Sequence, residues 1–394
     1  MPELRDVVII SAKRTPVGAF QGNLSSVSAS KLGSTAIKAV LEETKVDLNS
    51  IDEVIMGNVL SAGQGQAPAR QAALGAGLPD SVECLTINKM CGSGLKAVML
   101  ATQVIQTGDA EIIIAGGMEN MTQAPYLLPN GRDGHRLGHG QVLDSMIKDG
   151  LWDAYNDKHM GNCAELCASE KNYSREDQDA FAKTSYTQAQ SAQENGSFSD
   201  EIVPVSVPQR KGGPIIVDKD EEPGRANFEK MESLRPAFEK EGTITAANAS
   251  KINDGAAAIM IMSGEKANEL GLTPLATICA QASAAHAPEW FTTAPSKAIS
   301  KVLDKAGLQA EAIDLWEINE AFAPVAMAAI DDFNLSHDKV NVNGGAIAIG
   351  HAIGGSGARI LTTLIHAMKS RNVHTGLATL CIGGGEASAL IITR

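Results

Sequence analysis

Two segments of the chain, Ala36-Ile-Lys-Ala-Val-Leu-Glu42 and Ala298-Ile-Ser-Lys-Val-Leu-Asp304, repeat one apolar pattern at an offset of 262 residues. The same offset places Ile51-Asp52 on Ile313-Asp314. Internal similarity at one spacing is typical of a duplicated structural unit. We therefore predict that the chain consists of two related halves.

A second repeated feature indicates what each half contains. At an offset of 263 residues, Gly92-Ser-Gly94 falls on Gly355-Ser-Gly357, and each triplet begins a helical pattern. Each helix leads to an apolar strand that ends in glycines, Ile112–Gly117 in one half and Leu377–Gly384 in the other. Short strands that alternate with such helices indicate βα units, so we predict an α/β protein whose halves stack through their helices.

The composition excludes several classes of protein. A chain of 394 residues suggests two or three domains, and 44% hydrophobic with 20% charged residues indicates a globular protein. A net charge of −13 argues against a nucleic-acid partner, and no apolar run is long enough to suggest a membrane span. Six cysteines do not suggest a disulfide framework, and no targeting segment is visible, so we expect a cytoplasmic location.

The region between the halves has no counterpart in the repeat. We predict an N-terminal half over residues 1–117, an inserted loop domain over 118–247, a return to the N-terminal half over 248–270 and a C-terminal half over 271–394. Within the insertion, Ser174 and Asp177 form a capping-box-like helix start. Such insertions often carry ligand contacts.

Cys91 follows a predicted strand and directly precedes Gly92-Ser-Gly94. A thiol at a helix N-terminus has a lowered pKa, because the free N–H groups stabilise the thiolate. The glycines would also let a substrate approach the backbone. Cys91 is therefore a candidate nucleophile, and a small buried residue in a tight turn is the alternative.

His351 lies four residues before the second Gly-Ser-Gly. If the two halves pack face to face, the equivalent turns meet, and His351 becomes a candidate base for Cys91. A surface loop histidine is the alternative.

Cys381 ends an apolar strand before Gly383-Gly-Gly385. The edge of a sheet at the end of a strand is a common place for an active site. These glycines are a poor match to a dinucleotide-binding loop, because the chain ends within ten residues and no helix follows them.

A metal site is a further possibility, because His159, Cys163 and Cys167 recur at every fourth residue. They offer three ligands without an obvious fourth, and we expect no metal here.

Four segments resemble the signature blocks of the thiolases: Asn88-Lys-Met-Cys-Gly-Ser-Gly94, Asn319-Glu-Ala-Phe-Ala323, Asn343-Gly-Gly-Ala-Ile-Ala-Ile-Gly-His351 and Thr379-Leu-Cys-Ile-Gly-Gly-Gly385. The likeness extends over essentially the whole chain and is greatest to the acetyl-CoA acetyltransferase branch. It implies two five-stranded mixed sheets, with helices between and outside them, plus the inserted loop domain. It also implies an acyltransferase that condenses two acetyl-CoA reversibly to acetoacetyl-CoA and CoA through an acyl-cysteine. A 3-ketoacyl-CoA thiolase acting on longer chains is the alternative.

The resemblance also implies roles for individual residues. Cys91 is similar to the acyl-accepting nucleophile, His351 to its base and Cys381 to the acid/base at the substrate α-carbon. Asn319 matches the residue that holds a water in one oxyanion hole, which His351 completes, and the N–H groups of Cys91 and Gly383 would form the second. The residues implied for the substrate and CoA pocket are His159, Met160, Arg225, Phe238, Ala249, Ser250, Ile252, Phe291, Ala321 and Phe322.

The resemblance implies acyl-CoA substrates, no separate cofactor and a homodimer or homotetramer whose contact includes residues 129–140. Non-catalytic binding by the duplicated fold, or dinucleotide chemistry, are the alternatives from other classes. The sequence departs from the family at Ala352, Lys251 and Phe291, and at Pro223-Gly-Arg225, where the expected arginine is displaced. These departures bear on CoA affinity and acyl-chain length.

Overall fold

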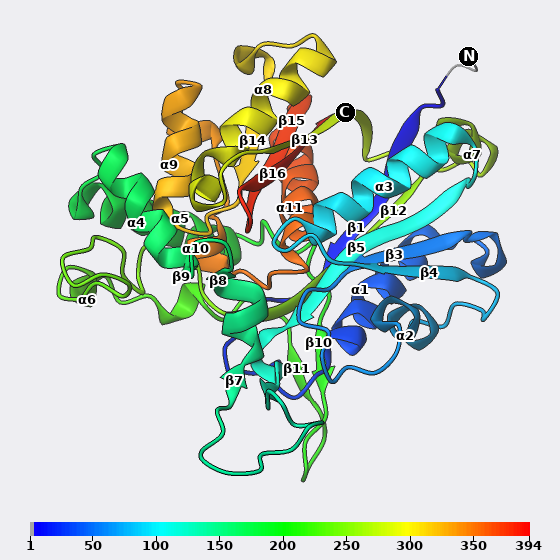
Figure 1. Cartoon of the computed structure of the whole chain (residues 1–394). Helices are drawn as coiled ribbons and strands as arrows, with labels where there is room; N and C mark the ends of the chain where they lie inside the picture. The colour runs from blue at the N-terminus through cyan, green and yellow to red at the C-terminus, as the bar shows by residue number, and fades with distance from the viewer. Residues whose placement is uncertain (1–3) are drawn as a thin grey trace.

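The computed structural model describes residues 4–394, and its centre is a mixed sheet of ten strands (Figure 1). Nine of the strands follow one another across the sheet in the order β14 (Leu315–Ile318), β15 (Thr375–Ile382), β16 (Glu386–Thr393), β13 (Ala276–Ala285), β1 (Val7–Arg14), β12 (Asn253–Ser263), β5 (Ile112–Asn120), β3 (Glu53–Gly57) and β4 (Glu83–Ile87). The tenth, β2 (Gly18–Ala19), pairs with β12.

The sheet consists of two halves that meet at β1 and β13. These strands share only two residue pairs, Val8 with Thr277 and Ile9 with Ala276. In the second half, the strand that would correspond to β4 is reduced to one bridge between Trp316 and Val340. The predicted α/β fold of two related sheets is confirmed, and a short edge pairing joins the sheets.

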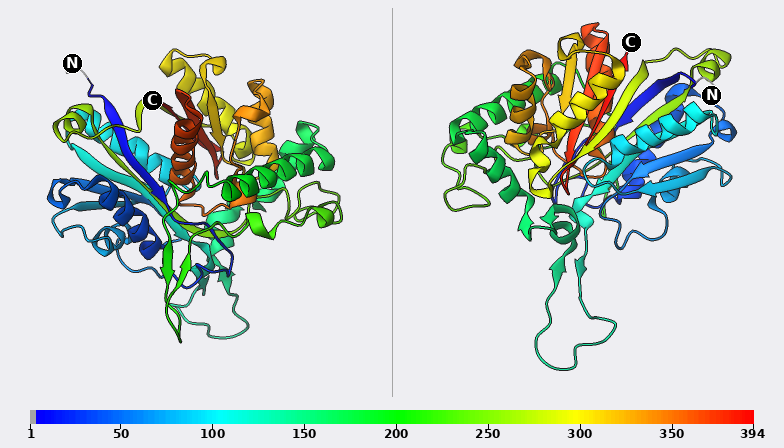
Figure 2. Two further views of the ribbon diagram at one scale, coloured as in Figure 1. Left: turned by 180° about the vertical axis from the view of Figure 1, so that it is seen from behind. Right: turned by 45° about the horizontal axis from the view of Figure 1, so that its top comes forward.

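Helices lie between the halves and on both outer faces (Figure 2). One apolar cluster joins α3 (Ser93–Thr107) and α11 (Ser356–Arg371) to strands of both halves. A second cluster packs α1 (Ala29–Thr44) and α2 (Pro68–Gly75) on the N-terminal half, and a third packs α8 (Ala294–Ala306) and α9 (Ala323–Asp332) on the C-terminal half. The order of layers is therefore helix, sheet, helix, sheet, helix.

The duplication extends to individual hydrogen bonds. One carboxylate oxygen of Asp52 accepts from the backbone N–H groups of residues 111 and 112, at 2.7 and 2.9 Å. Asp314, its counterpart at the offset of 262, accepts from the N–H groups of residues 374 and 375, both at 2.9 Å. Each aspartate fixes the start of the central strand of its half.

Two glycines of the Gly-Ser-Gly triplets allow α3 and α11 to touch. A Cβ atom at Gly94 would lie 2.7 Å from the backbone nitrogen of Ala358, and one at Gly357 would lie 2.3 Å from that of Leu95. The expectation that the glycines after Cys91 admit a substrate is wrong for Gly94, because its open side faces the partner helix.

The region between the halves contains two main helices, α4 (Met160–Glu170) and α5 (Arg175–Glu194). The predicted capping box of Ser174 and Asp177 is present at the start of α5. A long loop leaves the body of the protein between β6 (Tyr126–Leu127) and β7 (Leu143–Asp144), and Figure 2 shows it extending from the body. The remaining short strands and α-helices of the whole chain are β8 (Trp152–Asp153), β9 (Lys158–His159), β10 (Val205–Val207), β11 (Ile215–Val217), α6 (Phe228–Met231), α7 (Gly264–Glu269) and α10 (Ala346–Ile349).

Candidate active site

Cys91 lies in a tight turn between β4 and α3. Met90, the residue before it, has a left-handed backbone with φ of 47°, which is uncommon for a side chain of this size. Two polar side chains hold the turn: Asn88 accepts from the N–H of Met90 at 2.9 Å, and Ser93 accepts from the N–H of Lys89 at 2.8 Å. The turn therefore fixes the position of Cys91 just ahead of the helix.

A glycine hairpin from the second half contacts this turn. Cys381 is the next-to-last residue of β15, and residues 383–385 connect it to β16. The backbone N–H of Gly383 is directed at the Cys91 sulfur, as is the N–H of Cys91 itself. An ion pair between Lys89 and Glu386 fastens the two turns together. The two thiols that the sequence places 290 residues apart thus belong to one site.

The protonation of the two thiols differs from the expectation. Burial raises the pKa of Cys91 to about 11, although the two N–H groups act in the opposite direction. Burial and the nearby Cys91 raise the pKa of Cys381 well above its usual range. The prediction of a lowered pKa for Cys91 is wrong, because desolvation outweighs the helix N-terminus. A neutral thiol in this position requires a base.

The hydrogen bonds of the His351 side chain suit it to act as this base. Its Nδ1 lies 2.6 Å from the hydroxyl oxygen of Ser356, which donates its own proton to the carbonyl of Ala352 at 2.8 Å. The Ser356 hydroxyl has only one proton and donates it to Ala352. The proton between Ser356 and His351 must therefore be bound to Nδ1 of His351. Nε2 is therefore the unprotonated nitrogen, and Ser356 sets the tautomer.

Three buried polar atoms of the site lack a hydrogen-bond partner. Among residues 4–394, Nε2 of His351 and both amide atoms of Asn319 are buried and have no hydrogen-bond partner. Burial, together with the charge of Arg359, lowers the pKa of His351 to about 3, so the ring is neutral. Unpaired buried polar groups are costly, so each of these atoms is available to a bound ligand or water.

The segment that carries His351 packs against the start of α3. A Cβ at Gly57 would collide with both Ser93 and the carbonyl of Gly354, at 2.6 and 2.8 Å. The carboxylate of Glu119 accepts from the N–H of Gly354 at 2.9 Å, and burial raises its pKa to about 7. The two equivalent turns therefore meet, as the face-to-face packing of the halves predicted.

Next to Cys381 lies an aromatic cluster that contains most of the predicted pocket residues. His159 stacks on Phe238 with ring centroids 4.8 Å apart, and Phe322 makes edge contacts with Phe238 and Phe291 at 5.9 and 6.2 Å. The apolar members of this cluster include Met160, Ala249, Phe291, Ala321, Phe322 and Cys381.

The other predicted pocket residues lie around this cluster. Ser250 donates its N–H to the carbonyl of Ala321 at 3.0 Å, and Ile252 forms a bridge with His351. Arg225 is outside the cluster and exposed, and its guanidinium is 3.9 Å from Glu222.

The three residues considered for a metal do not face a common point. His159 is the N-cap of α4, and its Nδ1 accepts from the N–H of Gly161 at 3.0 Å. The Cys163 thiol contacts Asp153. Among the described residues, no group of three or more His, Cys, Asp or Glu side chains is arranged to hold a metal ion.

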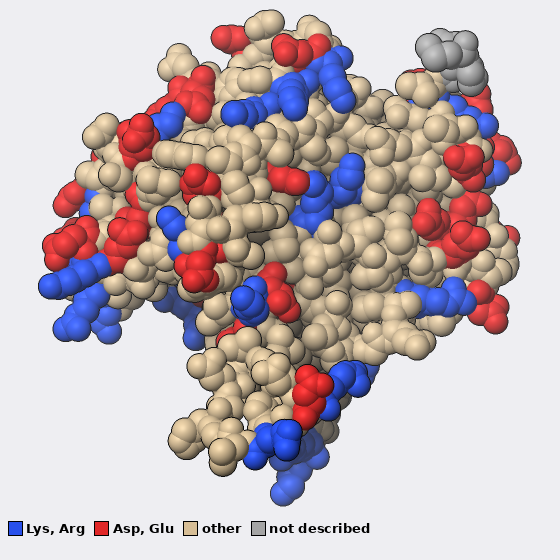
Figure 3. All heavy atoms as spheres, in the orientation of Figure 1, with Lys and Arg blue, Asp and Glu red and all other residues tan. Residues whose placement is uncertain are grey.

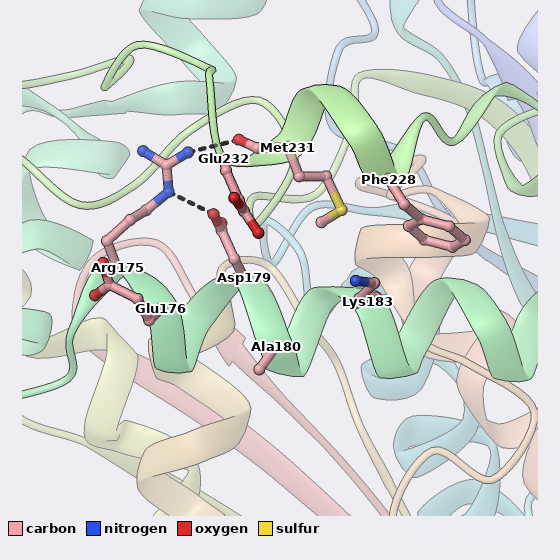
Figure 4. Close-up of a pocket in the computed structure, with 8 residues that line it drawn as sticks. All are labelled: Arg175, Glu176, Asp179, Ala180, Lys183, Phe228, Met231 and Glu232. Atoms are coloured by element: carbon pink, nitrogen blue, oxygen red, sulfur yellow. Dashed lines mark hydrogen bonds and ion pairs between the residues drawn. The ribbon is translucent and has the colours of Figure 1, made fainter.

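The surface features of the described residues are weaker candidates for a functional site. On the face drawn in Figure 3, basic and acidic residues are intermingled, which does not suit a nucleic-acid interface. A groove of about 410 Å³ between α5 and α6 carries Arg175, Asp179 and Lys183, but none of the predicted site residues (Figure 4). No helix within residues 4–394 is long and apolar enough to cross a membrane.

Three residues of the site were not identified from the sequence: Ser356, Asn253 and Glu119. Ser356 was visible only as the middle of a Gly-Ser-Gly helix start. Asn253 accepts from the N–H of His351 at 2.8 Å, and Glu119 holds Gly354. The sequence offered one indication that Asn253 belongs to the site, its place in the polar run Asn248–Asp254.

Comparisons with known proteins agree with this geometry. The model of the thiolase N-terminal domain matches residues 7–265, and that of the C-terminal domain matches residues 272–394. The chain is 53% identical to an acetyl-CoA acetyltransferase of Pseudomonas aeruginosa and 54% identical to one of Cupriavidus necator, each over 99% of this chain and 100% of the relative.

Solved structures are similar over the full length as well. The acetyl-CoA acetyltransferase of Bacillus anthracis superposes with a TM-score of 0.97 at 41% identity and covers 100% of both chains. A thiolase of Ascaris suum in complex with coenzyme A has a TM-score of 0.94 at 44% identity and covers 99% of this chain and 100% of its own. The match of both domain models and the full-length relatives show that this chain belongs to the thiolase family.

Proposed function

We propose that the protein is an acetyl-CoA acetyltransferase, which condenses two acetyl-CoA to acetoacetyl-CoA and CoA and also runs the reverse thiolysis. The observation that carries this is the meeting of Cys91, Cys381 and the N–H of Gly383 in one site, where Cys381 is buried and Cys91 is partly buried. Full-length relatives at 53% and 54% identity that are named acetyl-CoA acetyltransferase support the same activity.

The first half-reaction transfers an acetyl group to Cys91. The sulfur attacks the thioester carbonyl while Nε2 of His351 takes the thiol proton, a role that suits its neutral ring and fixed tautomer. The carbon–sulfur bond to CoA breaks, and Cys381 gives its proton to the departing CoA sulfur. Acetyl-Cys91, an imidazolium at His351 and a thiolate at Cys381 remain.

The second half-reaction makes the carbon–carbon bond. The Cys381 thiolate takes a proton from the methyl group of a second acetyl-CoA, and the enolate attacks the acetyl group on Cys91. The bond to the Cys91 sulfur breaks, acetoacetyl-CoA leaves, and the sulfur regains its proton from His351. The thiols and the imidazole carry every proton, so the reaction requires no metal or prosthetic group.

Negative charge develops on two oxygens during these steps. The enolate oxygen would receive bonds from Nε2 of His351 and from a water held by Asn319, the atoms that lack partners in the protein. The tetrahedral oxygen on Cys91 would receive bonds from the N–H groups of Cys91 and Gly383. Fixed donors of this kind contribute roughly 10²–10³ in rate each.

Phe291 favours a short acyl group. Its ring is buried, packs on Phe322 and shares a cluster with Cys381, so it occupies space beside the reacting thiol. This favours acetyl transfer over the alternative of a thiolase for longer 3-ketoacyl chains.

The aromatic cluster would line the pantetheine arm of CoA. His159, Phe238 and Phe322 belong to this cluster, the backbone N–H of Ser250 joins it at Ala321, and the exposed Arg225 would receive the phosphates. A homodimer or homotetramer in the cytoplasm completes the proposal. The exposed apolar side chains Leu128 and Leu137 on the long loop support a contact between subunits there.

Rapid-quench mass spectrometry with acetyl-CoA alone tests the activity. We expect a mass increase of one acetyl group on Cys91, and formation of acetoacetyl-CoA on longer incubation. Absence of the adduct in an enzyme that nevertheless forms acetoacetyl-CoA would exclude the covalent route.

A further inference from the structure

The four residues Ala249–Ile252 connect the separate parts of the site. Ala249 bridges to Phe322, the N–H of Ser250 donates to the carbonyl of Ala321, and Ile252 bridges to His351. Three of the four residues therefore touch either the aromatic cluster or the base. Lys251 is the exception, and its side chain leaves the site in another direction.

The ammonium of Lys251 returns to its own segment. Nζ donates to the carbonyl of Ala249 at 2.9 Å and lies 5.5 Å from the ring centroid of Tyr186, a buried residue of α5. It thus cross-links the connecting segment internally and binds the segment to α5. A hydrogen bond from a charged donor and a cation–π contact are both stronger where water is excluded.

Two buried carboxylates act on this ammonium through their charge, without forming an ion pair with it. The charges of Glu222 and Glu320 favour its protonated form, whereas burial, the largest effect, lowers the pKa of Lys251 to about 8. Glu320 is already held by Ser185 and Asn341 at 2.7 and 2.8 Å, and Glu222 is contacted by Asn253 at 3.4 Å. Each carboxylate is thus tied to a residue of a different segment.

We propose that Lys251 is a positioning residue, an internal cation that holds Ala249–Ile252 in the conformation required to bind the acyl-CoA arm. The proposal rests on the proposed function, because it assigns Ser250 and its neighbours to the substrate pocket. It follows from the contacts of one ammonium with the Ala249 carbonyl and the Tyr186 ring, and from the charges of two buried carboxylates that act on it without an ion-pair contact. None of these contacts involves a reacting atom, so loss of the Lys251 charge should leave the rate of the chemical step unchanged.

The first test is the kinetics of Lys251→Met, which keeps the length of the side chain and removes its charge. We expect KM for acetoacetyl-CoA in thiolysis to rise about tenfold, the size of one lost charged hydrogen bond, with kcat within about twofold of wild type. Lys183→Met is the matched control, because that ammonium also lies over an aromatic ring, 5.9 Å from Phe228, but is exposed and away from the thiols. We expect its KM to be unchanged.

The second test is chemical rescue. Lys251→Ala leaves room for a small cation, so ethylammonium chloride should lower its KM towards the wild-type value, while sodium chloride at equal ionic strength should not. The third is the pH profile: KM of wild type should rise above about pH 8 as Lys251 loses its proton, and Lys251→Arg, which stays charged, should not show this rise.

An unchanged KM in Lys251→Met, or a loss of kcat that ethylammonium does not reverse, would overturn the proposal. A wild-type protein without any acyl transfer would instead overturn the proposed function, so the two failures are distinguishable.

Discussion

The hydrogen bond between Ser356 and His351 gives the sharpest structural prediction. In Ser356→Ala, Nδ1–H of His351 loses its acceptor at 2.6 Å in a site where both residues are buried. A buried donor left unsatisfied costs about 1–3 kcal/mol, which corresponds to a fall of roughly 5- to 150-fold in the population of the productive tautomer. We expect the single-turnover rate of Cys91 acetylation to fall by a factor in this range.

The assay is rapid-quench detection of acetyl-Cys91 at several pH values. Thr102→Val is the control, because Thr102 is a buried hydroxyl of the equivalent helix α3 that donates only to the Val98 carbonyl, at 2.8 Å. We expect the control to acetylate at the wild-type rate. Acetylation of Ser356→Ala at the wild-type rate would show that Ser356 does not set the tautomer of His351.

Three further predictions concern the thiol, the acyl pocket and the loop. Because burial raises the pKa of Cys91 to about 11, alkylation of Cys91 by iodoacetamide should accelerate about tenfold per pH unit from pH 7 to 9, and a rate that levels off near pH 7 would contradict the assignment. Phe291→Ala should increase thiolysis of 3-ketohexanoyl-CoA relative to acetoacetyl-CoA by about tenfold or more, and an unchanged ratio would remove Phe291 as the limit on chain length. Leu128→Asp combined with Leu137→Asp should lower the oligomer mass in light scattering without changing kcat, and an unchanged mass would place the subunit contact elsewhere.

The duplication, the α/β class and the order of the elements were predictable from the sequence. The signals are the repeated apolar positions at helical spacing and the two Gly-Ser-Gly helix starts, whereas the close crossing of the helices at Gly94 and Gly357 is visible only in the structure. The meeting of the Cys91 turn with the segment that carries His351 also followed, because equivalent turns of two stacked halves lie close together.

The protonation states were not predictable, because they depend on burial. A helix start beside Cys91 is visible in the sequence, but the desolvation that raises the pKa of Cys91 arises only when distant parts of the folded chain pack around it. Similarly, Ser356 gives no sign in the sequence that its hydroxyl meets His351. Lys251 is visible only as a departure from the family, since Tyr186, Glu222 and Glu320 reach it from distant segments.

The division of labour between the two thiols is the central claim, and Cys381→Ser tests it most directly. A serine hydroxyl keeps the shape of the side chain, but its far higher pKa makes it a poor acid or base. The measurement is hydrogen–deuterium exchange at the methyl group of acetyl-CoA, together with single-turnover acetylation of Cys91. We predict that Cys91 is still acetylated, while exchange and condensation slow by roughly 10²–10⁴. Exchange at the wild-type rate in Cys381→Ser would show that Cys381 is not the base at the α-carbon.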